Sequence, residues 1–142
     1  MKYQETAVIA EQQEIAEHIY SLWLKADKIA REARPGQFVS VYCRDESRLL
    51  PRPISICEID KEGGRLRLVY RTAGAGTREF SRLAAGDSLE LVGPLGNGFP
   101  LDKGYRKVLL VGGGIGVPPM VELAKWLPGE KMTVSGYRNG DL

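Results

Sequence analysis

The feature that most constrains the fold is a series of short strand-like runs, separated by turn residues, up to Pro94 of this 142-residue chain. The runs are rich in Val, Ile and Tyr and lie at residues 6–10, 37–43, 54–59, 65–71 and 88–92. Many short strands at this spacing are typical of an antiparallel sandwich or a small barrel. The fold predicted for this part of the chain is therefore mainly β.

The clearest strand lies at residues 65–71, "RLRLVYR", where apolar and basic residues alternate. A period of two places Leu66, Leu68 and Tyr70 on one face and the arginines on the other. We expect the apolar face to pack in the core and the arginines to face solvent.

One segment is ambiguous. Residues 14–26 carry apolar side chains at helical spacing, but the stretch "IYSLWL" within them is rich in strand formers. We interpret it as a strand, because a hairpin with residues 6–10 would supply the first strand pair of a barrel. A short helical turn is expected at residues 29–33, where Pro35 and Gly36 end it.

The pattern changes after Asp102. The elements expected there are an apolar strand, a glycine-rich turn, a helix and a second strand, at residues 107–111, 112–116, 117–127 and 131–137. A strand-helix-strand crossover of this kind builds parallel sheets. We therefore expect two parts, a barrel domain at residues 1–102 and the beginning of an α/β domain at residues 103–142.

Composition and charge exclude several classes of protein. The 20 basic and 18 acidic residues are spread along the chain and give a net charge of +2, which leaves no basic patch for nucleic acid or an anionic membrane. The longest apolar run, "VLLV", is far shorter than the roughly 20 residues of a membrane-spanning helix, and the polar start "MKYQE" is unlike a signal peptide. We expect a cytoplasmic protein.

The cysteines and the single histidine are not expected to form a reactive site. Cys43 and Cys57 lie in apolar strand-like runs, which favours buried structural thiols in a reducing compartment over a metal-ligand set. No metal ligands are therefore expected in this chain. We expect His18 to have a structural or exposed role.

Two glycine-rich turns precede predicted helices, and each could hold an anion on backbone amides. The turn "GGGIG" lacks the third glycine of the dinucleotide fingerprint G-x-G-x-x-G and lacks the Gly-Lys-Ser/Thr of a P-loop. The second turn, "AGAGT", ends at Thr77, which is predicted to be the N-cap of the next helix. From the residues alone, each turn is either a phosphate site or a tight turn.

A third motif is "LPRPISI" at residues 50–56. The ring of Pro53 drives Arg52 into an extended conformation at the start of a strand. The arginine either faces solvent or is aimed at an anion, for which a planar guanidinium is well suited.

In order along the chain, "RPIS", "AGAGT", "GPLGNGF" and "VLLVGGGIGVPP" resemble the ferredoxin-reductase superfamily, from end to end of the sequence. Within it, the chain is most similar to the electron-transfer subunits of NAD-linked dihydroorotate dehydrogenases, in which "RPISI" is typical. Related sulfide dehydrogenase subunits tend to carry a "PLT"-like variant. The resemblance implies an antiparallel Greek-key barrel that binds FAD, followed by the first β-α-β unit of a nucleotide-binding domain.

The resemblance also implies roles for individual residues. Arg52 would contact an FAD phosphate, Pro53 would hold its backbone, Ile54 would stand where many members have tyrosine, and Ser55 would face the polar edge of the flavin ring. The other residues implied to contact FAD are Val69, Tyr70 and Arg71 along the ribityl and adenosine path, and Gly76 and Thr77 at the pyrophosphate. Gly113, Gly114 and Gly116 match the NAD loop of the family. No catalytic side chain is implied, because the flavin carries the hydride chemistry.

The implied function is electron transfer, through FAD, between NAD and a partner subunit that holds FMN and oxidises dihydroorotate to orotate in pyrimidine biosynthesis. The complete enzyme would be a heterotetramer with a [2Fe-2S] centre. The family continues past residue 142 to a cysteine cluster that is absent here, since such a centre takes four thiolates and this chain has two cysteines. We therefore expect a fragment or a truncated gene product.

In such a fragment, residues 107–142 would be poorly ordered, or would lean on the barrel or on another copy. Two alternatives stay open. One is the FAD subunit of a sulfide dehydrogenase or ferredoxin:NADP oxidoreductase of the same superfamily. The other is a non-catalytic barrel that serves as an interaction module.

Overall fold

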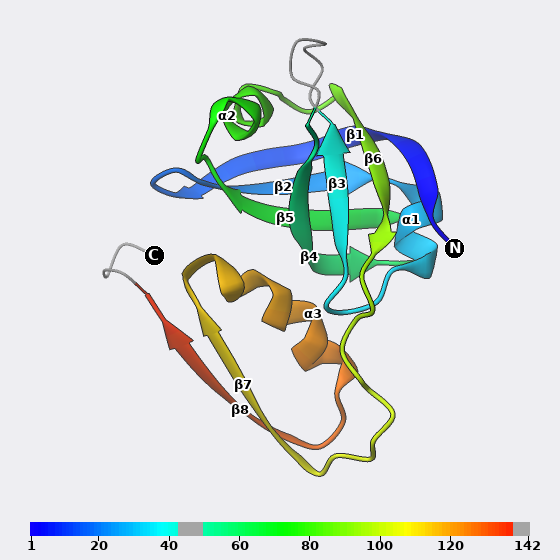
Figure 1. The fold of residues 1–142 in the computed structure, drawn as a ribbon, viewed down its shortest axis with the longest axis vertical. Helices are drawn as coiled ribbons and strands as arrows, with labels where there is room; N and C mark the ends of the chain where they lie inside the picture. The colour runs from blue at the N-terminus through cyan, green and yellow to red at the C-terminus, as the bar shows by residue number, and fades with distance from the viewer. Residues whose placement is uncertain (43–49, 138–142) are drawn as a thin grey trace.

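The structure, a computed structural model, describes residues 1–42 and 50–137, and consists of a β-barrel above a small α/β part (Figure 1). The barrel part holds β1 (Tyr3–Ala16), β2 (Ile19–Lys25), α1 (Asp27–Glu32), β3 (Phe38–Tyr42), β4 (Arg52–Asp60), β5 (Arg65–Arg71), α2 (Ala75–Ser81) and β6 (Ser88–Leu95). The α/β part holds β7 (Lys107–Gly113), the 3-10 turn η1 (Gly114–Gly116), α3 (Pro118–Trp126) and β8 (Glu130–Gly136). Cys43 lies outside the described residues.

The barrel is closed in the order β1-β2-β5-β4-β3-β6, and every pair within it is antiparallel. The prediction of a mainly β barrel is confirmed. The alternation in β5 also holds, because Leu66, Leu68 and Tyr70 are buried in the core. Arg65 is exposed, whereas Arg67 is only half-exposed and donates from Nε to Ser21 Oγ at 2.8 Å.

The ambiguous segment is a strand, as interpreted from the sequence. β2 pairs with β1, with Val8 opposite Lys25 and Ile9 opposite Leu24. The connecting turn holds His18 at a φ of 63°, and the side chain is exposed there. The first hairpin therefore supplies two neighbouring barrel strands.

Helix α1 lies at one end of the barrel (Figure 1) and is capped from a distant strand. Its own N-cap, Ala26, makes no side-chain hydrogen bond. Instead, the carboxylate of Glu5 in β1 accepts the amides of Lys28 and Ile29, each at 3.1 Å. Two first-turn donors that have no partner within the helix are thus satisfied, and Ile29 packs fully into the core.

Helix α2 begins earlier than predicted. Gly74 is the N-cap and Ala75 the first helical residue, so the assignment of Thr77 as the N-cap was wrong. The Thr77 hydroxyl accepts the amide of Ala73 at 2.8 Å and donates to the carbonyl of Gly74 at 3.2 Å, which stabilises the turn from inside the helix. Phe80, later in α2, is fully buried and packs edge-on against Tyr70.

The α/β part has the predicted strand-helix-strand order. β7 and β8 are parallel, and α3 packs on the Leu110 side of β7 and against β4 of the barrel. The expectation that this part leans on the barrel is therefore confirmed. The opposite face of the two strands is exposed and apolar; it consists of Leu109, Val111, Met132 and Val134. Among the helices of residues 1–42 and 50–137, none has the length and hydropathy needed to cross a membrane.

Candidate functional site

The candidate site lies where β4 and β5 part from one another. The two strands pair from Asp60 opposite Arg65 to Ile56 opposite Leu68, with an irregularity between Ile56 and Glu58. Among the described residues, no pair joins the two strands beyond that point, and each strand is paired only along its other edge. Residues 52–55 of β4 pair with β3, and residues 69–71 of β5 pair with β2. The barrel wall therefore has a gap between two strands that both carry predicted FAD contacts.

The side chains at this gap fall into an outward and an inward set. Arg52, Pro53 and Ser55 are exposed on β4, and Arg71 is exposed at the end of β5. Two guanidinium groups and a hydroxyl are thus available to a ligand on the outer surface. Such groups suit phosphate oxygens, because guanidinium donors can bind them in pairs.

The inward set consists of Ile54 and Tyr70, which belong to the main core cluster. Tyr70 stacks on Tyr20 with ring centroids 5.7 Å apart, and its hydroxyl donates to the side-chain oxygen of Gln12 at 2.6 Å. Burial raises the pKa of the Tyr70 phenol above its ordinary value of 10.0. Contact of Ile54 or Tyr70 with FAD would therefore come from the backbone rather than from the side chain, and both assignments stay predictions.

Helix α2 lies at the same end of the barrel as the start of β4 (Figure 1). Gly76 and Thr77 stand in its first turn, where backbone amides have no carbonyl partner within the helix. A side chain at Gly74 would meet nothing within 4 Å, so the N-cap is open to its surroundings, whereas Gly76 is buried and Thr77 is half-buried. The C-terminal end of α2 is held by Gln12, because its Nε2 donates to the carbonyls of Phe80 and Leu83 at 2.9 and 2.6 Å.

The second glycine-rich turn approaches the end of β5. A β-carbon added to Gly114 would lie 3.8 Å from a guanidinium nitrogen of Arg71, and Gly114 has a φ of +53°, which disfavours other residues. A β-carbon on Gly112 would lie 3.0 Å from the carbonyl oxygen of Gly116. The structure thus brings Arg71 and the predicted NAD loop together, whereas a β-carbon on Gly113 would lie 3.9 Å from the carbonyl oxygen of Gly136 and one on Gly116 would meet nothing within 4 Å.

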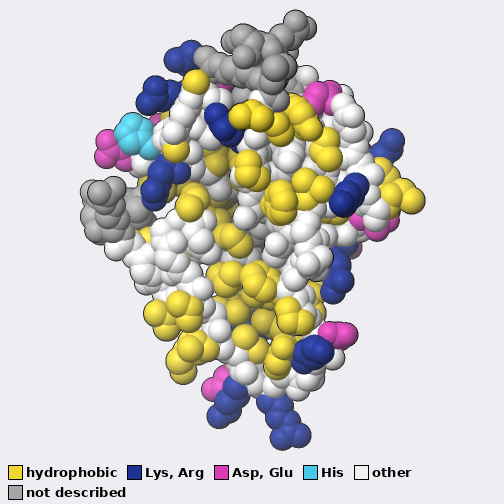
Figure 2. Space-filling view, viewed as in Figure 1, with side chains coloured by type: hydrophobic (Ala, Val, Ile, Leu, Met, Phe, Trp, Pro, Cys, Tyr) yellow, Lys and Arg dark blue, Asp and Glu magenta, His cyan; other side chains and the backbone are white. Residues whose placement is uncertain are grey.

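The structure has two apolar hollows that sequence reasoning did not find, and the first of them adjoins the second glycine-rich turn. The first, of about 200 Å³, lies between the β1–β2 hairpin, β5 and the glycine turn; it is lined by Ile15, Ala16, Ile19, Val69, Gly114, Ile115, Val117, Pro118 and Tyr137. Figure 2 shows apolar side chains gathered over both the barrel and the α/β part on one face. Of the residues predicted to contact FAD, Val69 is the one that lines this hollow.

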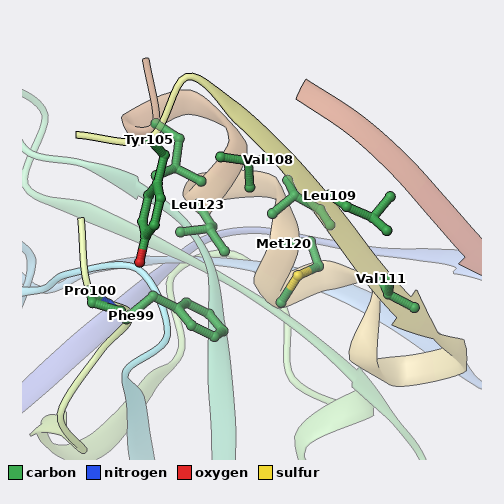
Figure 3. A pocket seen from close by; sticks show the side chains of 10 residues that line it. Phe99, Pro100, Tyr105, Val108, Leu109, Val111, Met120 and Leu123 are labelled. Carbon is green, nitrogen blue, oxygen red and sulfur yellow. The ribbon is translucent and has the colours of Figure 1, made fainter. Parts of the chain in front are cut away.

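The second hollow, of about 330 Å³, lies in the α/β part. Figure 3 shows Met120 and Leu123 of α3 beside Val108 of β7, with Tyr105 and Phe99 on one side. Its lining residues come from the loop before β7, from β7 and from α3, so its presence depends on how α3 packs on β7 and not on the periodicity of one element.

Cys57 stands at the irregularity where β4 and β5 part, but its thiol is buried there. Cys57 is 1% exposed, as expected for a structural thiol, and burial raises its pKa to about 11. Across residues 1–42 and 50–137, His, Cys, Asp and Glu side chains form no group of three or more that could hold a metal ion. That no side chain of this chain is catalytic stays a prediction.

Comparison with known proteins agrees with this geometry. Residues 6–99 match the family described as the oxidoreductase FAD-binding domain. The chain belongs to this family. The matched residues span the barrel, including both strands of the gap and α2.

The curated relatives point to one kind of enzyme subunit. The chain is 46% identical over 147 aligned residues to the electron transfer subunit of dihydroorotate dehydrogenase B (NAD(+)) from Streptococcus mutans, and 43% identical over 134 residues to that from Listeria monocytogenes. These alignments cover 99% and 93% of this chain but 56% and 52% of the relatives. The chain thus spans about half the length of the curated relatives it matches.

Solved structures show the same fold. An NADH-dependent reduced ferredoxin-NADP oxidoreductase aligns with a TM-score of 0.87 at 34% identity, over 95% of this chain and 49% of the other. Phthalate dioxygenase reductase aligns with a TM-score of 0.79 at 26% identity, over 97% of this chain and 45% of the other. The ferredoxin-reductase-like fold expected from the motifs is thus confirmed.

Proposed function

We propose that this chain is the FAD-binding part of the electron-transfer subunit of an NAD-linked dihydroorotate dehydrogenase. The observation that carries the proposal is the gap between β4 and β5, which presents the motif residues Arg52, Ser55 and Arg71 on the barrel surface. The family of the chain and its relatives at 43–47% identity support the same function.

The exposed arginines at the gap suit the phosphates of FAD in charge. Arg52, and Arg71 across the gap, would bind phosphate oxygens, and the first turn of α2 at Gly76 and Thr77 would receive the pyrophosphate. Val69 would pack against the apolar portion of the ligand, while Ser55 would donate its hydroxyl to the polar edge of the flavin ring. The extended backbone at Pro53 would hold the Arg52 guanidinium in place.

The nicotinamide side of the reaction would depend on the turn at Gly113, Gly114 and Gly116. Close approach of Gly114 to Arg71 places this turn beside the end of β5. Bound FAD would supply hydride exchange with NAD and one-electron transfer onward. The residues of this chain would bind and orient the two nucleotides, and no side chain would need to move a proton.

The remainder of the relay would lie outside this chain. Two cysteines do not fit a [2Fe-2S] centre of the four-thiolate kind, so no ligand set for it is assigned here. We propose that the partner is an FMN-containing catalytic subunit that oxidises dihydroorotate, assembled with this subunit as a heterotetramer. The relatives are named as electron transfer subunits, which supports a partner of this kind.

The decisive experiment is titration of the purified chain with FAD, followed by its visible flavin absorbance and by thermal unfolding. A hundredfold excess of FAD over Kd stabilises the folded state by about 2.7 kcal/mol and raises Tm by roughly 5–10 °C. Arg52→Ala should weaken FAD binding about tenfold or more, because a charged hydrogen bond is lost.

The matched control is Arg31→Ala, which removes an exposed arginine from the last turn of α1. Its FAD affinity should equal that of the wild-type chain. A wild-type chain that takes up no FAD, or an Arg52→Ala variant that binds FAD as tightly, would contradict the proposed site.

One structural neighbour favours a second candidate. The ferredoxin-NADP oxidoreductase that aligns at a TM-score of 0.87 raises the alternative of an FAD subunit that serves ferredoxin chemistry. Both candidates bind FAD, so the partner discriminates between them. A complex with a dihydroorotate dehydrogenase catalytic subunit, isolated from the source cells, would favour the first; its replacement by a ferredoxin-reducing subunit would favour the second.

A further inference from the structure

Helix α3 covers an edge of the barrel that β3 leaves open. Pairing of β3 with β4 ends at Ser55, and the carbonyl of Gln37 takes the amide of Ile56 at 3.1 Å. Farther along β4, the amide of Ile59 donates to Oε2 of Glu122 at 3.1 Å. A side chain from α3 thus replaces the missing strand as the acceptor for a backbone donor of the barrel.

Glu122 is the only charged side chain among the buried residues of the described chain, with 4% of its surface exposed. Its other oxygen accepts the indole N–H of Trp126 at 2.8 Å, and Lys125 Nζ lies 3.7 Å from Oε2. A buried carboxylate without such partners would be strongly destabilising, so these contacts fix the rotamer of Glu122.

The surroundings of Glu122 extend the link to the barrel. Lys125 also contacts Glu58 of β4 at 3.3 Å, and Glu58 in turn lies 3.6 Å from Arg67 of β5. Val121 packs against the buried cluster that contains Val69, whose residues come from β2, β4 and β5. One side of α3 is therefore tied to both strands that border the gap.

The same helix is continuous with the glycine turn. The amide of Val117 donates to the carbonyl of Gly114 at 3.2 Å, and the carbonyl of Gly116 lies against Gly112. On the barrel side, Ile59 and Ser55 belong to the same strand. A short, well-packed path thus runs from the proposed flavin contact, through Ile59, Glu122 and α3, to the proposed NAD loop.

We propose that Glu122 is a positioning residue that sets the place of the glycine turn relative to the flavin-binding edge of β4. The proposal rests on the proposed function for the roles of Ser55 and of the turn. Hydride transfer requires the two rings to be held within a narrow range of distances, and a misplacement of about 1 Å can cost a factor of roughly 100 in rate. A buried carboxylate bonded to barrel backbone provides that restraint.

The test compares Glu122→Ala and Glu122→Gln with the wild-type chain. The control is Glu130→Gln, which removes an exposed carboxylate paired only loosely with Lys107 at 3.9 Å. Residual dipolar couplings in solution give the orientation of α3 relative to the barrel, and amide exchange reports the Ile59 hydrogen bond. FAD affinity and the rate of reduction of bound FAD by saturating NADH give the functional readout.

In Glu122→Ala, the couplings of α3 and β7 should no longer fit the barrel as one rigid body, and exchange at Ile59 should speed up about tenfold or more. Reduction by NADH should slow roughly 10- to 100-fold while the FAD Kd stays within about twofold. Glu122→Gln keeps an acceptor oxygen and should recover part of both effects, and Glu130→Gln should match the wild type.

Unchanged orientation and rate in Glu122→Ala would overturn the proposal. A loss of FAD binding or of barrel couplings in both Glu122 variants would also overturn it, because Glu122 would then support the fold in general. If the wild-type chain binds no FAD, the proposed function fails. The orientation of α3 in the variants still decides the role of Glu122.

Discussion

The hydroxyl of Tyr70 in β5 donates a hydrogen bond of 2.6 Å to the side-chain oxygen of Gln12 in β1. The side-chain nitrogen of the same Gln12 donates to the carbonyls of Phe80 and Leu83 at the end of α2. One amide side chain therefore connects the barrel core to the helix that begins at the proposed pyrophosphate site. It satisfies a buried phenol and two backbone carbonyls at once.

Replacement of Gln12 by Ala should lower the free energy of unfolding by about 1–3 kcal/mol, because the buried Tyr70 hydroxyl loses its partner. The end of α2 should also loosen, so FAD affinity should fall. Urea unfolding and FAD titration measure the two effects. Gln13→Ala is the control, since Gln13 is the exposed neighbour on the same strand. Equal stability of the two variants would show that the Gln12 network contributes nothing.

The glycine turn should tolerate Ala at one position and not at another. A β-carbon at Gly112 would lie 3.0 Å from the carbonyl oxygen of Gly116 and 3.1 Å from the α-carbon of Val117, whereas a β-carbon at Gly116 meets nothing within 4 Å. Gly112→Ala must therefore push the turn away from β7. We expect weaker binding of NADH by at least about tenfold in Gly112→Ala and little change in Gly116→Ala.

Calorimetric titration of NADH into the FAD-loaded chain measures this difference. Amide spectra of the two variants check that α3 is folded in both. An equal loss of NADH affinity in the two variants would mean that the turn is sensitive to any added methyl group, and the close approach at Gly112 would then not be the cause.

The strands and the barrel were predictable because their signals are local. Alternation in β5 and the strand formers in β2 depend on neighbours two residues apart, and both predictions were confirmed. The gap was not predictable in the same way. It depends on where the pairing between β4 and β5 ends, and on an irregularity at Cys57 that leaves no periodic trace.

Two further features show where sequence reasoning stops. Thr77 has the side chain of a good N-cap, but Gly74 takes that position because the helix starts two residues earlier than Thr77. Glu122 lies beside the apolar residues of α3, and a carboxylate there would ordinarily be assigned to solvent. Its burial depends on the amide of Ile59, which has no strand partner on the β3 side and donates to Glu122 instead. The place where β3 stops pairing with β4 leaves this amide available, and the sequence around Glu122 does not show it.

The buried thiol of Cys57 should make the barrel less stable in alkali. Burial raises the pKa of Cys57 from 9.0 to about 11, so its contribution is complete below pH 9.0 and is lost as the pH rises toward 11. The size of this loss is roughly 2–3 kcal/mol. Urea unfolding from pH 7 to pH 11 measures it in the wild type and in Cys57→Ala.

The alanine variant is the reference, because tyrosines and lysines elsewhere titrate in both proteins. Its stability should fall less steeply than that of the wild type across this range, although it starts lower through loss of packing. In a Cys43→Ser background, Cys57 should also react slowly with thiol reagents at pH 8. Parallel stability curves, or rapid reaction at pH 8, would contradict the assignment of a high pKa.

The exposed apolar face of β7 and β8 should drive association of the chain with itself. Met132 is 67% exposed and Val111 62% exposed on this face, whereas Leu110, on the other face of β7, is 5% exposed beneath α3. Met132→Lys should therefore change the free energy of unfolding by no more than about 0.5 kcal/mol, with little change in Tm. It should reduce concentration-dependent association.

Leu110→Lys is the contrasting variant. It should lower the free energy of unfolding by about 3 kcal/mol, because a charge enters a packed apolar cluster. Sedimentation velocity at several protein concentrations, with thermal unfolding in parallel, separates the two effects. Both variants add the same charge to the same two-stranded sheet. If association falls equally in both variants and their Tm values are the same, the added net charge is the cause. If association falls in Met132→Lys while its Tm is unchanged, and Leu110→Lys is unfolded, the loss of association is attributed to the apolar face itself.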